Sequence, residues 1–154
     1  MSIRYFALVY GIVFLLIGIL GFFPGLLAPF QSPDPQLAVT ATSGLLLGLF
    51  PVNVLHNLFH IAFGIWGVAA WRSVPAARFY GKAVAVIYAI LAVMGFFPVL
   101  NTTFGLIPLH GNDIWLHIVL AAVAAYFGFV AKVSSPVGTR HETTRVHEPR
   151  RDRG

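Results

Sequence analysis

Four long apolar stretches restrict the folds open to this chain more than any other feature of its sequence. They cover residues 3–23, 52–71, 79–97 and 114–133, and charged side chains occur only near their ends. About 20 helical residues cross the hydrocarbon core of a bilayer, so each stretch is long enough for one span. With 58% hydrophobic and 10% charged residues, a chain of 154 residues lacks the polar surface of a soluble domain. The sequence predicts an all-α membrane protein, a four-transmembrane-helix bundle whose partner is the lipid bilayer.

A short motif occurs twice and divides the bundle into halves. Residues 48–51 read Gly-Leu-Phe-Pro, residues 105–108 read Gly-Leu-Ile-Pro, and a histidine follows each proline after nine residues. The first and third stretches also end in the same four residues, Gly-Phe-Phe-Pro. This predicts two tandem helical hairpins, 3–71 and 79–133, of equal orientation and related as a parallel 2+2 repeat. The prolines that define the repeat are Pro24, Pro51, Pro98 and Pro108.

Segments outside the spans predict the domain boundaries. Residues 1–133 form the transmembrane domain, with a turn around 73–75 between the hairpins, where Pro75 is expected outside any helix. The outer loop 24–51 becomes apolar again over 37–50, which should lie in the interface or against the helices. Residues 134–154 are polar and basic without hydrophobic period, which predicts a disordered cytoplasmic tail.

The basic residues orient the chain. The ten Lys and Arg residues lie in three places: at the start of the first stretch, from the end of the second stretch to the start of the third, and from the end of the fourth stretch onward. The two loops on the opposite side have none. The positive-inside rule then places the N- and C-termini in the cytoplasm. This topology accounts for the net charge of +5, so no nucleic-acid partner is expected.

Polar residues recur at matching places near the outer ends of the second and fourth stretches. Residues three, four and seven apart share a helix face, and the 57-residue offset between the repeated prolines relates the two sets. The candidate metal or haem ligands are His56, His60, Asp113 and His117, supported by the polar residues Asn53, Asn57 and His110. Three imidazoles and a carboxylate suit a first-row transition metal, and His60 with His117 alone would suit haem.

A structural role competes with this site hypothesis. Asn53, Asn112 and Asp113 stand where helices begin, and such residues commonly cap free amides. Histidines near a membrane interface often bond a carbonyl of a neighbouring helix. The chain has no cysteine, no phosphate-binding loop and no convincing nucleophile set, so no catalytic residue is assigned and an enzyme is not favoured.

The leading interpretation is therefore a non-enzymatic structural protein or accessory subunit. Small residues at helical spacing predict close packing and a homo-oligomer or a larger membrane complex. The alternative is a metal- or haem-binding protein, on the ground that polar residues inside spans are costly and often functional.

One family resemblance accompanies these patterns. Residues 48–60 read Gly-Leu-Phe-Pro-Val-Asn-Val-Leu-His-Asn-Leu-Phe-His and are followed by Asn112-x-x-Trp115-Leu116-His117. This chain resembles, from about residue 5 to 130, a bacterial family of small four-helix membrane proteins catalogued as a domain of unknown function. The resemblance implies the fold and a place in the bacterial cytoplasmic (inner) membrane. It implies no activity, so no site residue comes from it.

Overall fold

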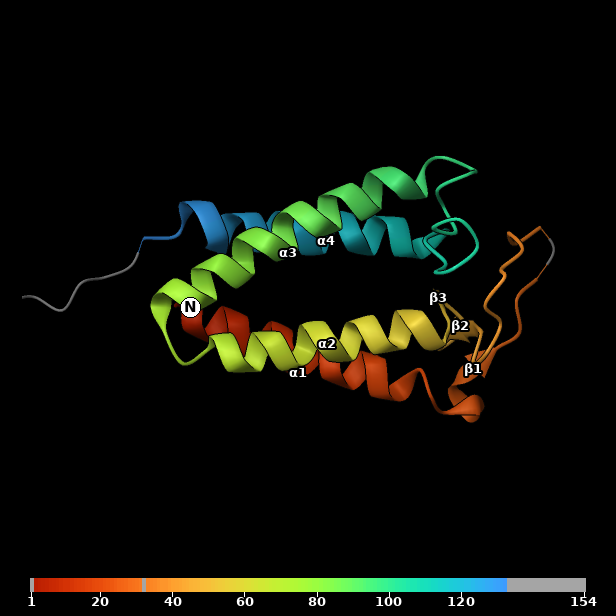
Figure 1. Cartoon of the computed structure of the whole chain (residues 1–154), viewed down its shortest axis with the longest axis horizontal. Coiled ribbons are helices and arrows are strands. Elements are labelled where there is room, and N and C mark those ends of the chain that lie inside the picture. The colour runs from red at the N-terminus through yellow and green to blue at the C-terminus, as the bar shows by residue number, and fades with distance from the viewer. Residues whose placement is uncertain (1, 32, 133–154) are drawn as a thin grey trace, which may run out of the picture.

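Helices make up most of the computed structural model, which describes residues 2–31 and 33–132 (Figure 1). The long helices are α1 (Ile3–Leu20), α2 (Val54–Ala70), α3 (Val74–Gly95) and α4 (Asn112–Ala125), and a π-helical segment, η2 (Tyr126–Val130), continues α4. The predicted tail, 134–154, lies outside the described residues.

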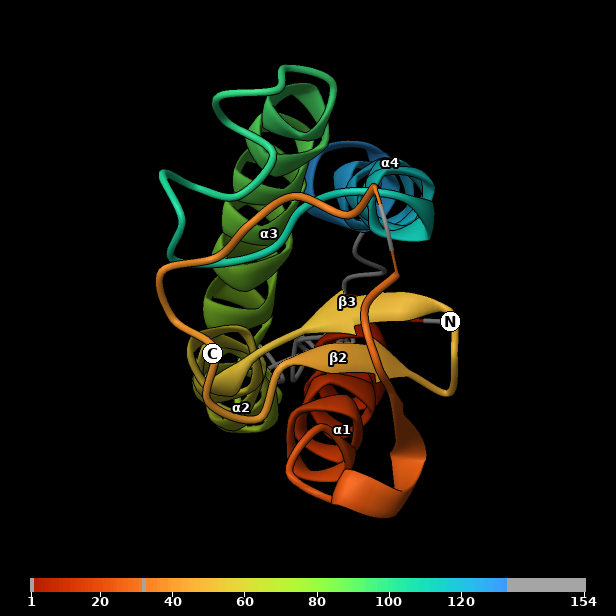
Figure 2. The same ribbon diagram turned by 90° about the vertical axis from the view of Figure 1, so that its right-hand side faces the viewer.

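The helices pack as two pairs, α1 with α2 and α3 with α4 (Figures 1 and 2). Small residues allow the backbones of each pair to approach. A Cβ added to Gly11 would lie 2.5 Å from the backbone nitrogen of Val68 and 2.8 Å from the carbonyl oxygen of Gly64. In the other pair, a Cβ added to Gly128 would lie 2.7 Å from the nitrogen of Lys82. Glycine at such positions is the usual means of close helix packing in membranes.

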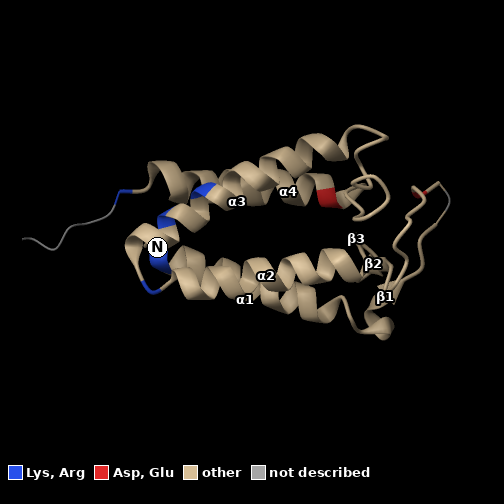
Figure 3. Ribbon diagram, viewed as in Figure 1, with Lys and Arg blue, Asp and Glu red and all other residues tan. Residues whose placement is uncertain are grey.

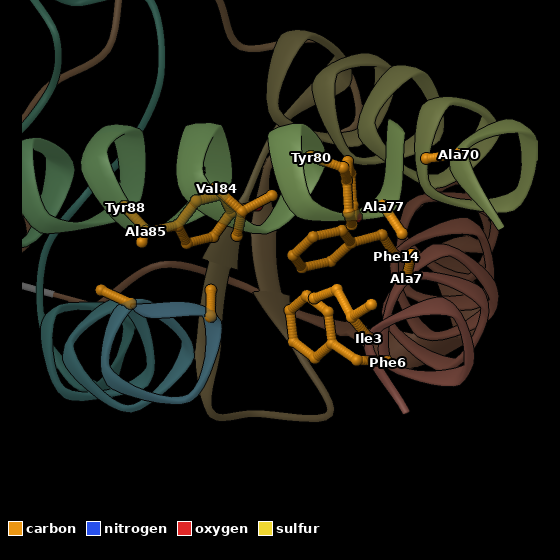
Figure 4. Close-up of a cluster of buried hydrophobic side chains, with 12 residues drawn as sticks. Ile3, Phe6, Ala7, Phe14, Ala70, Ala77, Tyr80, Val84, Ala85 and Tyr88 are labelled. Carbon is orange, nitrogen blue, oxygen red and sulfur yellow. The ribbon is translucent and has the colours of Figure 1, made fainter. Parts of the chain in front are cut away.

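An aromatic core joins the two pairs (Figure 4). Phe14 of α1 stacks on Tyr88 of α3 with ring centroids 5.4 Å apart, and Phe6 stacks on Phe127 of η2 at 4.8 Å. Phe6, Phe14 and Tyr88 are almost fully excluded from the surface, whereas Phe127 is partly buried and packs against this core.

Within residues 2–31 and 33–132, three helices are long and apolar enough to cross a membrane: Ile3–Leu20, Val74–Gly95 and Asn112–Val130. Apolar side chains are exposed on their outer faces, as lipid contact requires. The predicted mostly helical fold is confirmed, and these three helices have the length and composition of membrane spans. Helix α2 is also apolar but has only 17 residues, about 25 Å at 1.5 Å per residue, which is the short end of the range for a span.

The all-α prediction is wrong for the outer loop. After a short 3-10 helix, η1 (Pro24–Leu26), the chain forms an antiparallel sheet of β1 (Leu27–Ala28), β2 (Gly44–Leu46) and β3 (Phe50–Val52). The sheet lies over the ends of α1 and α2 (Figure 1). It pairs backbone groups that would otherwise be unsatisfied beside the apolar helices, and strands this short have no sequence period that could reveal them.

The prediction for Pro75 is also wrong. Helix α3 begins at Val74, five residues before the predicted start, with Pro75 in its first turn. A first-turn proline costs no hydrogen bond, because amides there have no partner within the helix. Ser73 caps the helix, since its Oγ accepts from the Ala76 amide at 3.3 Å.

Charge is segregated between the two ends of the bundle (Figure 3). The described Lys and Arg residues lie at one end, and the two described acids, Asp34 and Asp113, lie at or beyond the other. Two arginines bond carbonyls where helices end: Arg4 donates to Trp71 at 2.7 Å and Arg78 to Ala131 at 2.7 Å. We call these the basic end and the outer end.

Candidate metal site between α2 and α4

Helices α2 and α4 bring four ionisable side chains together at the outer end. His56 and His60 lie on the first two turns of α2, and Asp113 and His117 lie on those of α4. All four are buried, with at most 6% of each residue exposed. The structure therefore brings the four candidate ligands into one region.

The start of α2 fixes the two histidines of that helix. The Asn53 side chain accepts from the His56 amide at 3.0 Å, which caps the helix as predicted. His60 follows one turn later, and its ring stacks on that of His56 with centroids 4.6 Å apart.

A backbone contact fixes the tautomer of His56. Its Nδ1 lies 3.0 Å from the carbonyl oxygen of Pro51. A carbonyl can only accept, so Nδ1 carries the hydrogen and Nε2 keeps its lone pair. An imidazole held by a carbonyl in this way is the usual arrangement of a metal-binding histidine.

Asp113 and His117 form the other half of the cluster. The Asp113 carboxylate lies 3.3 Å from Nδ1 of His117, one turn along α4. His56, Asp113 and His117 each offer one ligand atom, and these three atoms all lie within 4.8 Å of one another. His60 is not a member of this group of three. Its Nδ1 is buried and has no hydrogen-bond partner within the described residues.

The separations of the donor atoms lie near those of a bound ion, since Asp113 and His117 are 3.3 Å apart and no pair exceeds 4.8 Å. Ligands of a tetrahedral centre at about 2.0–2.1 Å are about 3.3–3.4 Å from one another. A pair at the 4.8 Å limit would have to approach by at most about 1.5 Å, which a side-chain rotation supplies. The donor set fits zinc or another first-row ion, with a fourth position open.

Tyr88 and Phe14 surround the cluster, and our sequence reasoning missed both. The Tyr88 ring packs edge-on against His117 at 4.9 Å, and the Phe14 ring lies 5.6 Å from His60. The two residues are 74 positions apart, the same offset that separates the repeated Gly-Phe-Phe-Pro ends. That offset of 74 residues was the sequence signal that could have related Tyr88 to Phe14.

The three supporting polar residues have different surroundings. Asn53 donates to the carbonyls of Val39 at 3.0 Å and Leu106 at 2.6 Å, so it ties the two outer loops together. Asn57 is fully buried, and neither atom of its amide has a partner among the described residues. Both residues lie outside the group of three.

His110 lies in the loop before α4, apart from the cluster. Its Nδ1 is 3.7 Å from the Asp34 carboxylate. Burial lowers the pKa of His110 below its ordinary value, and Asp34 acts in the opposite direction.

Side-chain capping by Asn112 or Asp113 is wrong, although Asp113 does lie in the first turn of α4, where a carboxylate would complement the helix dipole. Helix α4 starts after Gly111, which has φ 64° and offers no side-chain cap, and Asn112 and Asp113 lie inside the first turn. Asn112 instead donates to the carbonyl of Leu49 at 3.3 Å.

Comparison with known proteins gives a family and no activity. No curated protein and no solved structure matches the chain. One family match covers residues 4–130, nearly the whole helical region described above. The chain therefore belongs to the family described as a domain of unknown function, DUF4383.

Proposed function

We propose that this membrane domain binds a transition-metal ion through His56, Asp113 and His117. The observation that carries the proposal is the convergence of three buried donor atoms, from two helices, within 4.8 Å. Buried ionisable groups inside a membrane domain are costly, and a metal ion would balance the carboxylate and use the imidazole lone pairs. When bound, the ion would act as a Lewis acid at its open position.

The spacing of the rings favours an ion over haem. The imidazole of His56 lies 4.6 Å from His60 and 6.4 Å from His117, centroid to centroid. A macrocycle between His60 and His117 would have to displace these rings, whereas an ion needs only side-chain rotations.

Metal analysis of purified protein tests this function. Protein prepared without chelator or a histidine tag should carry about one metal ion per chain by elemental analysis. His117→Ala should lose it, whereas His60→Ala, a matched histidine outside the group of three, should retain it. Metal-free wild-type protein that gains no ion on addition of Zn²⁺, Mn²⁺ or Fe²⁺ contradicts the proposal.

A structural or accessory role is the second candidate. The close helix contacts at Gly11 and Gly64 support a protein whose main property is tight packing. In that case the histidines serve the fold, and the protein should migrate above its 16.8 kDa monomer or carry a partner in mild detergent. Strictly monomeric, partner-free behaviour weighs against it.

We also infer that the two helix pairs are a tandem repeat and that all four helices span the membrane. Two features at the outer end support the repeat. Leu47 and Gly48 have positive φ, and so do Phe104 and Gly105, the residues 57 positions later. An L side chain rarely adopts this backbone region, so its recurrence at matching places is informative.

The second feature is a pair of reciprocal hydrogen bonds across the halves. Asn53 donates to the Leu106 carbonyl, and Asn112 donates to the Leu49 carbonyl. The two acceptors, Leu49 and Leu106, are 57 positions apart, whereas the donors are 59 apart, so the acceptors alone follow the repeat offset.

The basic end is assigned to the cytoplasm by the positive-inside rule, with an inner membrane of a bacterium as the expected location. Single cysteines introduced at residues 104 and 72 test this orientation. The cysteine at 104 should be labelled only from the periplasmic side, and the cysteine at 72 only from the cytoplasmic side. The reverse pattern contradicts the orientation.

A further inference from the structure

A cavity opens beside the histidine cluster. It has a volume of about 280 Å³ and lies between α2, α3 and the loop that precedes α4. Apolar and aromatic side chains form most of its wall, among them Phe59, Phe63 and Leu91. His56, His60, Tyr88 and His117 also line it. Phe59 is 54% exposed on the outer face of α2, so the cavity reaches the lipid-facing surface.

The loop before α4 closes the cavity at the outer end. Thr103, Ile107 and Leu109 of this loop line it. The loop is held to the first half of the chain, because the Gly105 carbonyl accepts from the Ala38 amide at 2.8 Å and the Leu106 carbonyl accepts from Asn53. The cavity is thus a built part of the fold.

Size restricts the occupant to a single substituted ring. A cavity of about 150 Å³ holds benzene, so about 280 Å³ accepts one ring with its substituents and leaves a long tail outside. A porphyrin, with four pyrrole rings, is too large for it.

Charge restricts the occupant further. None of the residues that line the cavity is a lysine or arginine, and the described basic residues lie at the opposite end of the bundle. A carboxylate or phosphate head would have no counter-charge there.

Hydrogen bonding favours an occupant with an acceptor atom over a pure hydrocarbon. The buried Nδ1 of His60 has no partner within the described residues, and an apolar molecule would leave it unpaired. A carbonyl oxygen on the occupant would accept from an imidazole N–H, and aromatic walls suit a flat ring.

We propose that this cavity binds the head group of a lipid-soluble quinone, which enters from the membrane beside Phe59 and bonds to His60. The isoprenoid tail stays in the lipid. The proposal concerns binding alone and does not need the metal ion of the preceding section, because His60 lies outside that ligand group.

Equilibrium dialysis of chelator-washed, metal-free protein in nanodiscs tests the proposal. The probe is a benzoquinone with one isoprene unit, measured against protein-free nanodiscs. Wild-type protein should bind it saturably at about one per chain. His60→Phe, which keeps a flat ring and removes the nitrogens, should weaken binding about tenfold, as expected for one lost hydrogen bond.

A pair of adjacent substitutions on α3 separates the cavity from general partitioning. Leu91→Trp fills the cavity and should abolish saturable binding. Ile90→Trp places the same side chain on the neighbouring position, which is 54% exposed and outside the cavity, and should leave the affinity within about twofold. If His60→Phe fails to fold, the two tryptophan variants alone decide whether the probe binds in the cavity.

Three results would overturn the proposal: no saturable binding to folded wild-type protein, equal binding by the two tryptophan variants, or equal competition by an alkylbenzene that has the same tail and no oxygen. Because the protein is metal-free, each result leaves the metal proposal untouched. Loss of metal in His117→Ala likewise leaves the quinone proposal untouched.

Discussion

The two helix pairs bury the same positions and differ in what they place there. Six residues of α1 are buried, and the residue 74 positions later on α3 is buried in every case. The pairs are Ile3 with Ala77, Phe6 with Tyr80, Ala7 with Gly81, Gly11 with Ala85, Phe14 with Tyr88, and Gly18 with Ala92. Helices α2 and α4 agree in the same way at an offset of 57 for four positions, which begin with His56 and Asp113.

The differences that involve ionisable or amide side chains of α2 and α4 lie at the outer end. His56 faces the cluster from α2, and its counterpart Asp113 is a carboxylate. Asn57 packs against Gly21, and the counterpart pair is Ile114 against Gly95. The shared positions maintain helix packing, and the unshared ones make the cluster asymmetric. Of the three donor atoms that lie within 4.8 Å of one another, one comes from the first pair and two come from the second.

The largest effect should come from the closest helix contact. Gly11→Ala adds a Cβ within 2.9 Å of three backbone atoms of α2, none of which can rotate away. We expect a loss of about 3 kcal/mol in unfolding free energy, measured by denaturant titration in detergent. The counterpart Ala85→Gly removes a Cβ and should cost about 1 kcal/mol. Equal effects at the two positions would show that the pairs are equally close.

Asn53 and Asn112 should differ although each bridges to the opposite loop. Asn53 is fully buried, caps α2 and donates to two carbonyls, whereas Asn112 is exposed and donates to one. Asn53→Ala should cost about 2 kcal/mol and Asn112→Ala about 0.5 kcal/mol, by the same titration. A larger loss at Asn112 would contradict this account of the loop contacts.

The Asn57 position should respond in the opposite direction. Asn57→Leu keeps the approximate shape and removes an amide with no partner in the described residues, so it should stabilise the fold by about 1 kcal/mol. Ile114→Asn places an amide in the equivalent site and should destabilise by about 2 kcal/mol. If Asn57→Leu destabilises the fold, the Asn57 amide has a hydrogen-bond partner in the functional protein.

Patterns with a long period carried most of what the sequence predicted. The apolar stretches and the repeated proline motif located four helices and placed His56, His60, Asp113 and His117 in one cluster. Each is a regularity that the chain repeats over many residues, so no tertiary information was needed.

Features that depend on tertiary contacts were not predictable. The exclusion of His60 from the ligand group follows from the stacking of its ring on His56, and two-residue strands such as β1 exist through their partners alone. Tyr88 belongs to the cluster because α3 lies beside α4 there. Pro75 was misjudged because a first-turn proline and a helix-breaking proline look alike without a cap.

The smallest expected effect concerns pH and again separates the two halves. His110 occupies the position that Asn53 has in the first half, and only the histidine can titrate. Burial lowers the pKa of His110 in the folded loop below its value of about 6.5 in the unfolded chain. Between these two pH values the unfolded chain binds more protons at His110 than the folded chain does. Stability should therefore fall as the pH drops below about 6.5.

His110→Gln should reduce the difference in thermal midpoint between about pH 7.5 and pH 5.5. Asp34→Asn, which removes the charge that favours protonated His110, should enlarge that difference. An unchanged difference in both variants would mean that His110 contributes nothing to the acid response of the outer end.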